Sequence, residues 1–227
     1  MQLWVGLGNP GAKYAKNRHN IGWMALEQIA ADHGFAPWRS KFQGALSEGK
    51  LGDDKVLLLR PETFMNLSGQ SVGEAMRFYK LSPADVTVWH DEIDLAPAKL
   101  RVKTGGGHAG HNGLRSIHQH IGPDYARVRL GVGHPGHKDR VPSYVLSDFA
   151  KADQVWLDDL LRGLSDGAAH LAQGDSGKFL NAVALRVAPP RSSNTKPKAE
   201  PAKSQDTPTE AKSDDRSALQ KLVDKFR

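Results

Sequence analysis

His19 is the residue on which we expect the chemistry of this chain to depend, because four other polar segments could supply it with partners. Each segment lies beside an apolar run that would end a buried strand or begin a helix, and α/β proteins place their sites on such loops. The four segments offer a carboxylate and several side-chain amides. Together with the His19 imidazole, these groups suit the activation of water and the stabilisation of an oxyanion. The segments are Gly8-Asn9-Pro10-Gly11, Met65-Asn66, His90-Asp91-Glu92 and Gly105 to Gly113.

His19 and Asn20 form the entry of a predicted helix over residues 21–34, where apolar residues recur at helical spacing. The positive pole of a helix dipole favours the neutral form of a histidine, which can act as a base. A lone histidine more often forms a hydrogen bond that holds a loop in place. The groups that surround His19 in the fold therefore determine whether it is a catalytic base or a structural residue.

Neighbouring carboxylates raise the alternative of a metal site. Asp91, Glu92 and Asp94 could hold magnesium, but such sites draw further carboxylates from other strands, and no second acidic cluster is as compact. A single carboxylate that orients a histidine fits better. His108 and His111 could share a metal only on a helix, whereas five glycines between residues 105 and 113 predict a loop. We expect no metal site.

Residues 6–11 formally match G-x-G-x-x-G after a predicted strand, the pattern of a dinucleotide site. Such a site needs a helix that begins within the turn. Pro10-Gly11 predicts a turn instead, and the next periodic apolar run begins only at Ile21. No acidic residue closes a second strand about 20 residues further on, so we expect no dinucleotide cofactor.

The composition predicts a soluble protein with one substantial core. The 227 residues suffice for one domain with an appendage at most. The chain contains no cysteine, which excludes disulfides and thiolate chemistry. Neither a signal peptide nor an apolar run of the roughly 20 residues that a membrane span needs is evident. We expect a cytoplasmic protein without a membrane partner.

Basic residues indicate a polyanionic partner. The net charge is +6, and residues 1–187 and 188–227 share the excess equally. Cations alternate with apolar residues along two predicted strands, and a basic turn follows the second strand. Phosphate contacts and a merely solvated strand face both remain open as explanations. The cations are Lys99, Arg101, Lys103, Arg127, Arg129, Lys138 and Arg140.

Apolar periodicity predicts strands and helices in alternation, and hence an α/β domain over residues 1–187. From residue 188 to about 215 the composition shifts to Pro, Lys, Ser, Thr and Ala, which predicts a disordered tail over 188–227. Leu219, Leu222, Val223 and Phe226 predict a short amphipathic helix at its end. Strands are predicted at residues 2–5, 45–47, 55–59, 86–89, 98–103 and 127–132, and helices at 21–34, 68–79 with Ser68 as cap, 114–121, 151–171 and 179–185.

Six motifs follow one another across roughly residues 3 to 187: V-G-L-G-N-P-G-x-x-Y, R-H-N-x-G, F-M-N-x-S-G, H-D-E-x-D, G-G-G-H-x-G-H-N-G and R-x-G-x-G-H-P. Each motif alone is weak, but the six in this order are specific. In them the chain closely resembles the bacterial-type peptidyl-tRNA hydrolases. The resemblance implies a twisted mixed sheet flanked by helices in a monomer that needs no metal, cofactor or protein partner. It also implies hydrolysis of the ester between peptide and the tRNA 3′ ribose, and it does not extend to the tail.

The resemblance also implies roles for individual residues. His19 would be the catalytic base and Asp91 the carboxylate that orients it. The remaining residues fall into three groups: the amides Asn9, Asn66 and Asn112 that position substrate and water, the cleft residues Tyr14, Met65 and His111, and the phosphate contacts Lys103, Arg129 and Lys138.

The residues themselves favour direct attack by water. An ester is an easier target than an amide, so a neutral histidine with an amide donor near the oxyanion suffices. Ser68 is the plausible serine nucleophile, but it lacks the G-x-S-x-G turn that would expose it. The rival interpretations are an RNA-binding module that binds without turnover and a dinucleotide-dependent oxidoreductase.

Overall fold

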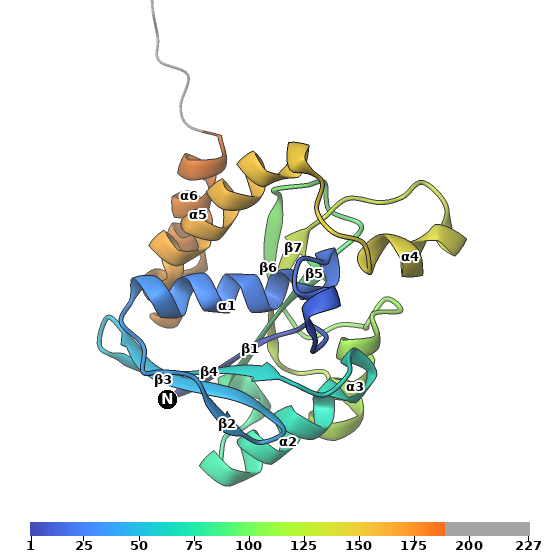
Figure 1. Cartoon of the computed structure of the whole chain (residues 1–227). Coiled ribbons are helices and arrows are strands. Elements are labelled where there is room, and N and C mark those ends of the chain that lie inside the picture. Colours follow the sequence, from blue (N-terminus) through green and yellow to red (C-terminus); the bar gives the residue numbers. More distant parts are fainter. Residues whose placement is uncertain (189–227) are drawn as a thin grey trace, which may run out of the picture. The chain divides into compact units, whose positions relative to one another are not determined.

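A seven-stranded mixed sheet forms the centre of the chain in the computed structural model, which describes residues 1–188 (Figure 1). Its strand order is β2-β3-β4-β1-β5-β7-β6. The neighbours β4, β1, β5 and β7 pair in parallel, whereas β2, β3 and β6 add antiparallel pairs at the two edges. The strands are β1 (Gln2–Gly6), β2 (Arg39–Lys41), β3 (Gly44–Leu51), β4 (Asp54–Pro61), β5 (Val86–Glu92), β6 (Leu100–Thr104) and β7 (Ala126–Gly131).

Helices cover both faces of this sheet, as Figure 1 shows. One face packs against α1 (Ile21–Asp32), α5 (Gln154–Ala172) and α6 (Ser176–Val187). The other face packs against α2 (Ser68–Tyr79) and α3 (Asn112–Ile121), and a short α4 (Val141–Val145) follows β7. Because both faces are covered, the central strands are almost continuously apolar.

The predicted α/β class and mixed sheet are confirmed, but strand β2 was not predicted, and three further local features differ from the predictions. β5 continues through Glu92, so the segment His90-Asp91-Glu92 is the buried end of a strand and not a loop. Ser68 is the first residue of α2 and does not cap it, since its hydroxyl donates backwards to the Met65 carbonyl at 2.9 Å. α4 follows the basic turn in a stretch for which no helix was predicted.

Residue 188 is the last that the structure describes. The predicted tail over 188–227 and its amphipathic helix therefore lie outside the described residues, except for Ala188. No helix within residues 1–188 is long and apolar enough to cross a membrane.

α1 approaches the sheet so closely that there is no room for a side chain at Gly22. A Cβ atom there would lie 2.3 Å from the Trp89 carbonyl oxygen and 2.6 Å from the Leu7 nitrogen. Gly6 faces the same contact, since its Cβ would lie 2.4 Å from the Gly22 oxygen. This contact fixes the distance between α1 and β5, and with it the position of His19 in the turn before α1.

We expect Gly22→Ala to lower the free energy of unfolding by about 1–3 kcal/mol, because close-packed backbone cannot accommodate the added methyl group. Gly177 is the matched control, since it too is the second residue of a helix, but its Cβ would meet only the Asp175 carboxylate at an ordinary 3.5 Å. Gly177→Ala should not destabilise, because alanine favours a helix over glycine. Urea denaturation of both variants measures the difference. Equal stability of the two variants would contradict the packing argument.

Candidate active site

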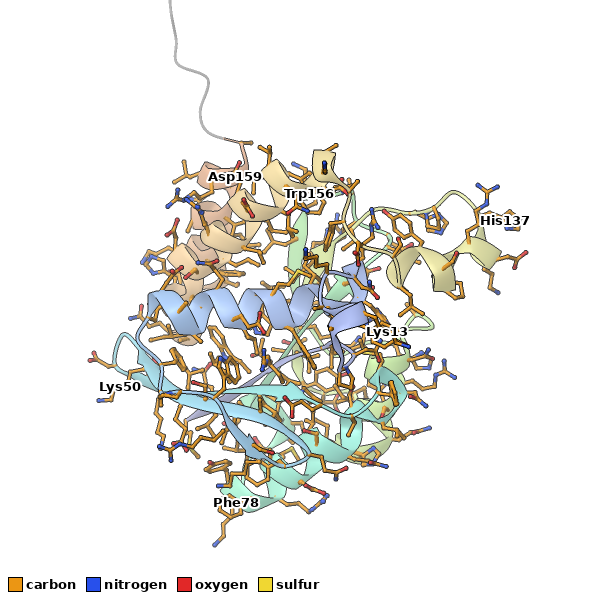
Figure 2. The ribbon with its side chains drawn as sticks, viewed as in Figure 1. Lys13, Lys50, Phe78, His137, Trp156 and Asp159 are labelled. Atoms are coloured by element: carbon orange, nitrogen blue, oxygen red, sulfur yellow. The ribbon has the colours of Figure 1, made fainter. Side chains whose placement is uncertain are left out.

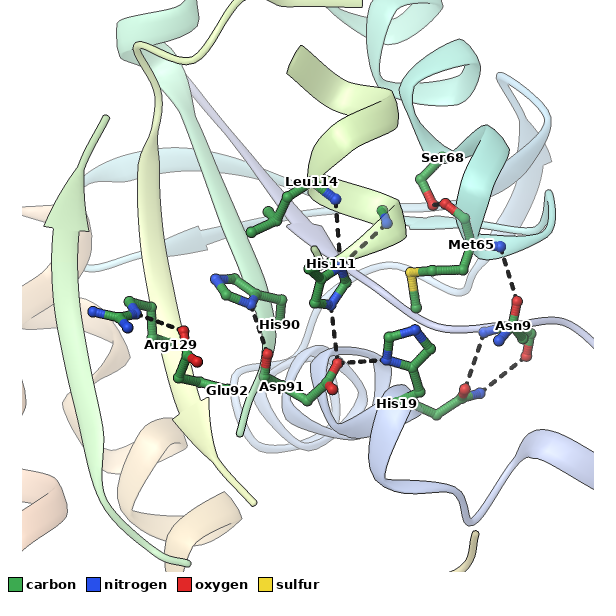
Figure 3. Close-up of polar contacts among 12 residues, drawn as sticks. Asn9, His19, Met65, Ser68, His90, Asp91, Glu92, His111, Leu114 and Arg129 are labelled. Carbon is green, nitrogen blue, oxygen red and sulfur yellow. Dashed lines mark hydrogen bonds and ion pairs between the residues drawn. The ribbon is translucent and has the colours of Figure 1, made fainter. Parts of the chain in front are cut away.

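The candidate site lies where the parallel strands end, because β4, β1 and β5 bring their carboxyl ends to the same edge of the sheet (Figure 3). Asn9 follows β1, Met65 follows β4, and Asp91 lies at the end of β5. The turn before α1 brings His19, and the residue before α3 is His111. Segments far apart in the sequence therefore meet at one place.

Asp91 accepts two hydrogen bonds from histidines through the same oxygen. Its Oδ1 lies 2.7 Å from His19 Nδ1 and 3.0 Å from His111 Nε2. His111 Nδ1 accepts from the main-chain N–H groups of Gly113 at 3.1 Å and Leu114 at 3.4 Å. His111 must therefore carry its proton on Nε2 and donate it to Asp91. Asp91 likewise fixes the proton of neutral His19 on Nδ1 and leaves Nε2 as the basic atom.

These contacts oppose the effect of burial on both ionisable groups. Burial would raise the pKa of Asp91, but His19 and His111 more than offset it and hold that pKa below its usual range. Burial would lower the pKa of His19, but the charge and hydrogen bond of Asp91 raise it above the ordinary 6.5. The expectation that the α1 dipole favours neutral His19 is thus wrong for the net effect, because the charge and hydrogen bond of Asp91 together outweigh burial and raise the pKa of His19.

Asn9 is held in one orientation by its neighbours. Its Oδ1 accepts from the Met65 N–H at 2.8 Å, which leaves Nδ2 as the donor available to a ligand. Asn20 fixes the main chain of Asn9, since its Oδ1 accepts from the Asn9 N–H and its Nδ2 donates to the Asn9 carbonyl, both at 3.0 Å. Asn20 stands beside His19 in the sequence, but no role was predicted for it.

All the predicted site residues line two adjoining cavities, of about 680 Å³ and 480 Å³. His19 and Asn112 line both cavities and therefore mark their junction. The larger cavity is lined by His19, Asp91, His111, Asn112, Lys103, Arg129 and Lys138, and the smaller by Asn9, Tyr14, His19, Met65, Asn66 and Asn112.

Lys103 and Lys138 are the exposed lysines of the larger cavity. Lys138 lies in the turn that leads to α4, and His137 beside it points away from the sheet in Figure 2. The other exposed cations of the predicted stripe, Lys99, Arg101 and Arg140, do not line either cavity within the described chain.

The two arginines of β7 correct the prediction of a continuous surface stripe. Arg129 is partly buried, and its Nε donates to Glu92 Oε2 at 2.8 Å. Arg127 lines the larger cavity but is only 4% exposed, and its guanidinium donates to the Gly107 carbonyl of the glycine-rich loop. Neither side chain is a freely solvated cation.

The three carboxylates of the magnesium alternative face different partners, which argues against one ion shared among them. Asp91 binds two histidines, Glu92 pairs with Arg129, and Asp94 is exposed. Within residues 1–188, the donor atoms of His19, Asp91 and His111 do lie within 4.8 Å of one another, close enough to hold a metal ion. Hydrogen bonds join His19 Nδ1, Asp91 Oδ1 and His111 Nε2 to one another, so these three atoms form a proton network.

Two features of the site were not predicted, although Arg18 belongs to the R-H-N-x-G motif. Pro142 and Val145 of α4 line both cavities. Arg18 holds the segment after α4 beside His19, because its guanidinium donates to Ser147 Oγ at 2.8 Å and pairs with Asp153 at 3.1 Å.

His90 also has a role in the site that was not predicted, although it belongs to the H-D-E-x-D motif. Its ring is 2% exposed, and its Nδ1 donates to the Asp91 carbonyl at 2.8 Å. Burial lowers the pKa of His90 to about 3, so this ring stays neutral. It contacts the ring of His111 edge-on at 5.1 Å and thereby supports the Asp91 pair.

Titration of His19 tests the effect of Asp91 directly. We expect the His19 imidazole to titrate above 6.5 by NMR, and Asp91→Asn to bring its pKa below that value, because only burial then remains. Asp94→Asn is the control, since it removes an exposed carboxylate of the same motif. An unchanged His19 titration in Asp91→Asn would show that another group sets its pKa.

Comparison with known proteins agrees with this geometry. A family model described as Peptidyl-tRNA hydrolase matches residues 3–191. Proteins named peptidyl-tRNA hydrolase from Jannaschia sp. (strain CCS1) and Dinoroseobacter shibae are 77% and 70% identical, and each alignment covers all of both chains. The crystal structure of peptidyl-tRNA hydrolase from Acinetobacter baumannii is 42% identical with a TM-score of 0.76, over 81% of this chain and 94% of that one. The chain therefore belongs to the peptidyl-tRNA hydrolase family.

Proposed function

We propose that this enzyme hydrolyses the ester bond of peptidyl-tRNA by direct attack of a water molecule that His19 activates. The observation that carries the proposal is the pairing of Asp91 Oδ1 with His19 Nδ1 at 2.7 Å, which leaves Nε2 as the basic atom at the junction of two cavities. A pKa raised from 6.5 suits a base that works near neutral pH. A module that only bound RNA would not need this buried pair.

The reaction follows from these positions. His19 Nε2 removes a proton from water as the oxygen attacks the ester carbonyl carbon, and the carbonyl oxygen becomes an oxyanion. Ionised Asp91 stabilises the imidazolium that forms. The oxyanion then collapses, the bond to the ribose oxygen breaks, and the imidazolium returns a proton to that oxygen. The products are the peptide, with a free carboxyl group, and tRNA.

The amides surround this reaction. Asn9 Nδ2 is a fixed donor for the oxyanion or the peptide, because its Oδ1 is already bound by the Met65 N–H. Asn66 and Asn112 line the smaller cavity and supply further amides for the substrate and water. Ser68 is no nucleophile in this scheme, because its side chain is buried and donates to the Met65 carbonyl.

The two cavities suit the two halves of the substrate. The larger cavity contains Lys103, Arg129 and Lys138, which fit the phosphates of the tRNA end. The smaller cavity has apolar walls, including Tyr14 and Met65, which fit the peptide. We further propose that residues 1–187 form the catalytic domain and that the enzyme acts in the cytoplasm as a monomer, without a metal, a cofactor or an obligate protein partner.

Removal of the base should abolish most turnover. We expect His19→Ala to lower kcat about 10²- to 10⁴-fold and to leave tRNA affinity unchanged, because a general base contributes to rate and not to binding. Retention of more than about a tenth of the activity would place the base elsewhere.

Asp91→Asn should lower the rate less than His19→Ala, because it removes orientation and charge support but leaves the base. The neutral, active form of His19 increases with pH, so the rise of kcat/KM should have its midpoint above pH 6.5 in the natural enzyme. In Asp91→Asn that midpoint should move to lower pH. An Asp91→Asn enzyme as inactive as His19→Ala would indicate a more direct role for the carboxylate.

Full activity should persist in EDTA, because hydrogen bonds join His19 Nδ1, Asp91 Oδ1 and His111 Nε2, and the remaining His19 nitrogen serves as the base. The assay needs added monovalent salt, since magnesium also folds tRNA. Activity that disappears and returns with a divalent ion would establish a metal at this group.

Removal of the exposed lysines should weaken tRNA binding and spare the chemistry. We expect Lys103→Gln with Lys138→Gln to raise KM severalfold. The log–log salt slope should decrease by up to about one unit for each phosphate that a lysine no longer neutralises. Arg129 is left in place, because its removal would leave partly buried Glu92 without its partner.

Two controls separate binding from folding. A small esterified fragment that lacks the tRNA body should be hydrolysed as before, and Arg101→Gln removes an exposed cation that does not line the described cavities. Equal slowing on both substrates would mean that the lysines support the cleft and do not bind the phosphates.

A further inference from the structure

Arg127 is a buried cation whose partners lie in the glycine-rich loop between β6 and α3. Its Nη1 donates to the Gly107 carbonyl at 2.7 Å, and its Nη2 donates to the Gly106 carbonyl. Nη2 also lies 3.0 Å from His118 Nε2, which must accept because arginine has no acceptor atom. The guanidinium lies 4.9 Å from the centre of the Tyr125 ring.

These partners offset much of the cost of burying the charge, although Nε has no hydrogen-bond partner among residues 1–188. A buried cation is costly unless hydrogen bonds satisfy it. None of the ion pairs found among residues 1–188 includes Arg127, so carbonyl oxygens of the loop take the place of a carboxylate. The guanidinium therefore binds the loop to β7 and to α3 at the same time.

Lys103 stands directly opposite Arg127 in the sheet. The two residues are register partners in the antiparallel pair of β6 and β7, where like charges repel. The loop relieves this repulsion, because the Gly106 and Gly107 carbonyls bind the guanidinium.

Gly106 also provides the place at which the Lys103 ammonium lies. Its φ of 93° belongs to the left-handed region that glycine tolerates, and a Cβ atom there would lie 2.8 Å from Lys103 Nζ. Gly106 thus accepts a hydrogen bond from Arg127 through its carbonyl oxygen. The Lys103 ammonium occupies the space that a side chain at position 106 would fill.

We propose that Arg127 is a positioning residue for tRNA binding, which holds the glycine-rich loop so that the Lys103 ammonium points into the larger cavity. The inference rests on the proposed role of Lys103 as a contact to a tRNA phosphate. Arginine suits the task better than lysine, because its planar fork can bind two carbonyl oxygens at once.

The test is a double-mutant cycle on the full chain, with KM and kcat measured on peptidyl-tRNA and on an esterified fragment without the tRNA body. We expect Arg127→Gln and Arg127→Lys each to raise KM for peptidyl-tRNA severalfold, by about the same factor as Lys103→Gln. The double variant Arg127→Gln with Lys103→Gln should be no worse than either single variant, because both changes remove the same phosphate interaction. Fragment hydrolysis should be unchanged throughout.

Gly106→Ala tests the same interaction with Arg127 in place. Alanine at a φ of 93° strains the loop, and its methyl group collides with the Lys103 ammonium, so both effects should raise KM for peptidyl-tRNA, with no further effect in a Lys103→Gln background. Arg101→Gln shows the effect of charge removal alone, and thermal unfolding of each variant shows that it is folded. If Arg127→Gln does not fold, Arg127→Lys and Gly106→Ala decide the question.

Three results would overturn the inference, and they differ from one another. Additive effects of Arg127→Gln and Lys103→Gln would mean that the residues act separately. Equal slowing of the fragment would mean that Arg127 supports the catalytic cleft. A normal KM in Lys103→Gln with a raised KM in Arg127→Gln would reject the phosphate role of Lys103 itself, and the proposal with it.

Discussion

The site depends on one carboxylate oxygen that accepts hydrogen bonds from two imidazoles. Asp91 Oδ1 receives His19 Nδ1 and His111 Nε2, and the main-chain N–H groups at the start of α3 determine which nitrogen of His111 carries the proton. The backbone at the start of α3 thus fixes the proton of His111 on Nε2. Asp91 accepts a hydrogen bond from that proton and from the proton on His19 Nδ1, which leaves His19 Nε2 as the base. The charge of Asp91 is retained in the interior because both neighbours donate to it.

Close packing of the backbone holds this arrangement. His19 precedes α1 and Asp91 ends β5, and these elements touch at Gly22, where a side chain would collide with the Trp89 carbonyl. Helix position and base position are therefore set by the same contact. On the side of α4, a charged side chain holds the site together. Arg18, in the turn that contains His19, binds Ser147 and Asp153 in the segment after α4.

The cations of the chain differ in function because they differ in burial. Lys103 and Lys138 reach into the larger cavity, Arg129 is paired with Glu92, and Arg127 binds carbonyl oxygens within the fold. Alternation along a strand predicts which residues share a face, but not which of them a loop then covers. The glycine-rich loop covers Arg127 and leaves Lys103 accessible, so neighbours of equal charge have different surroundings.

The sequence by itself determined the α/β class, most strand and helix positions, and the candidate residues, since periodicity and ordered motifs are local properties. The residues indicated that a single carboxylate among Asp91, Glu92 and Asp94 orients a histidine, and the family resemblance assigned that role to Asp91, which pairs with His19. The tertiary structure alone decided the raised pKa of His19, the inward turn of Arg127 and the place of α4 beside the base. These features depend on which groups from distant segments meet in a buried space, and distances of that kind are not contained in residue spacing along the chain.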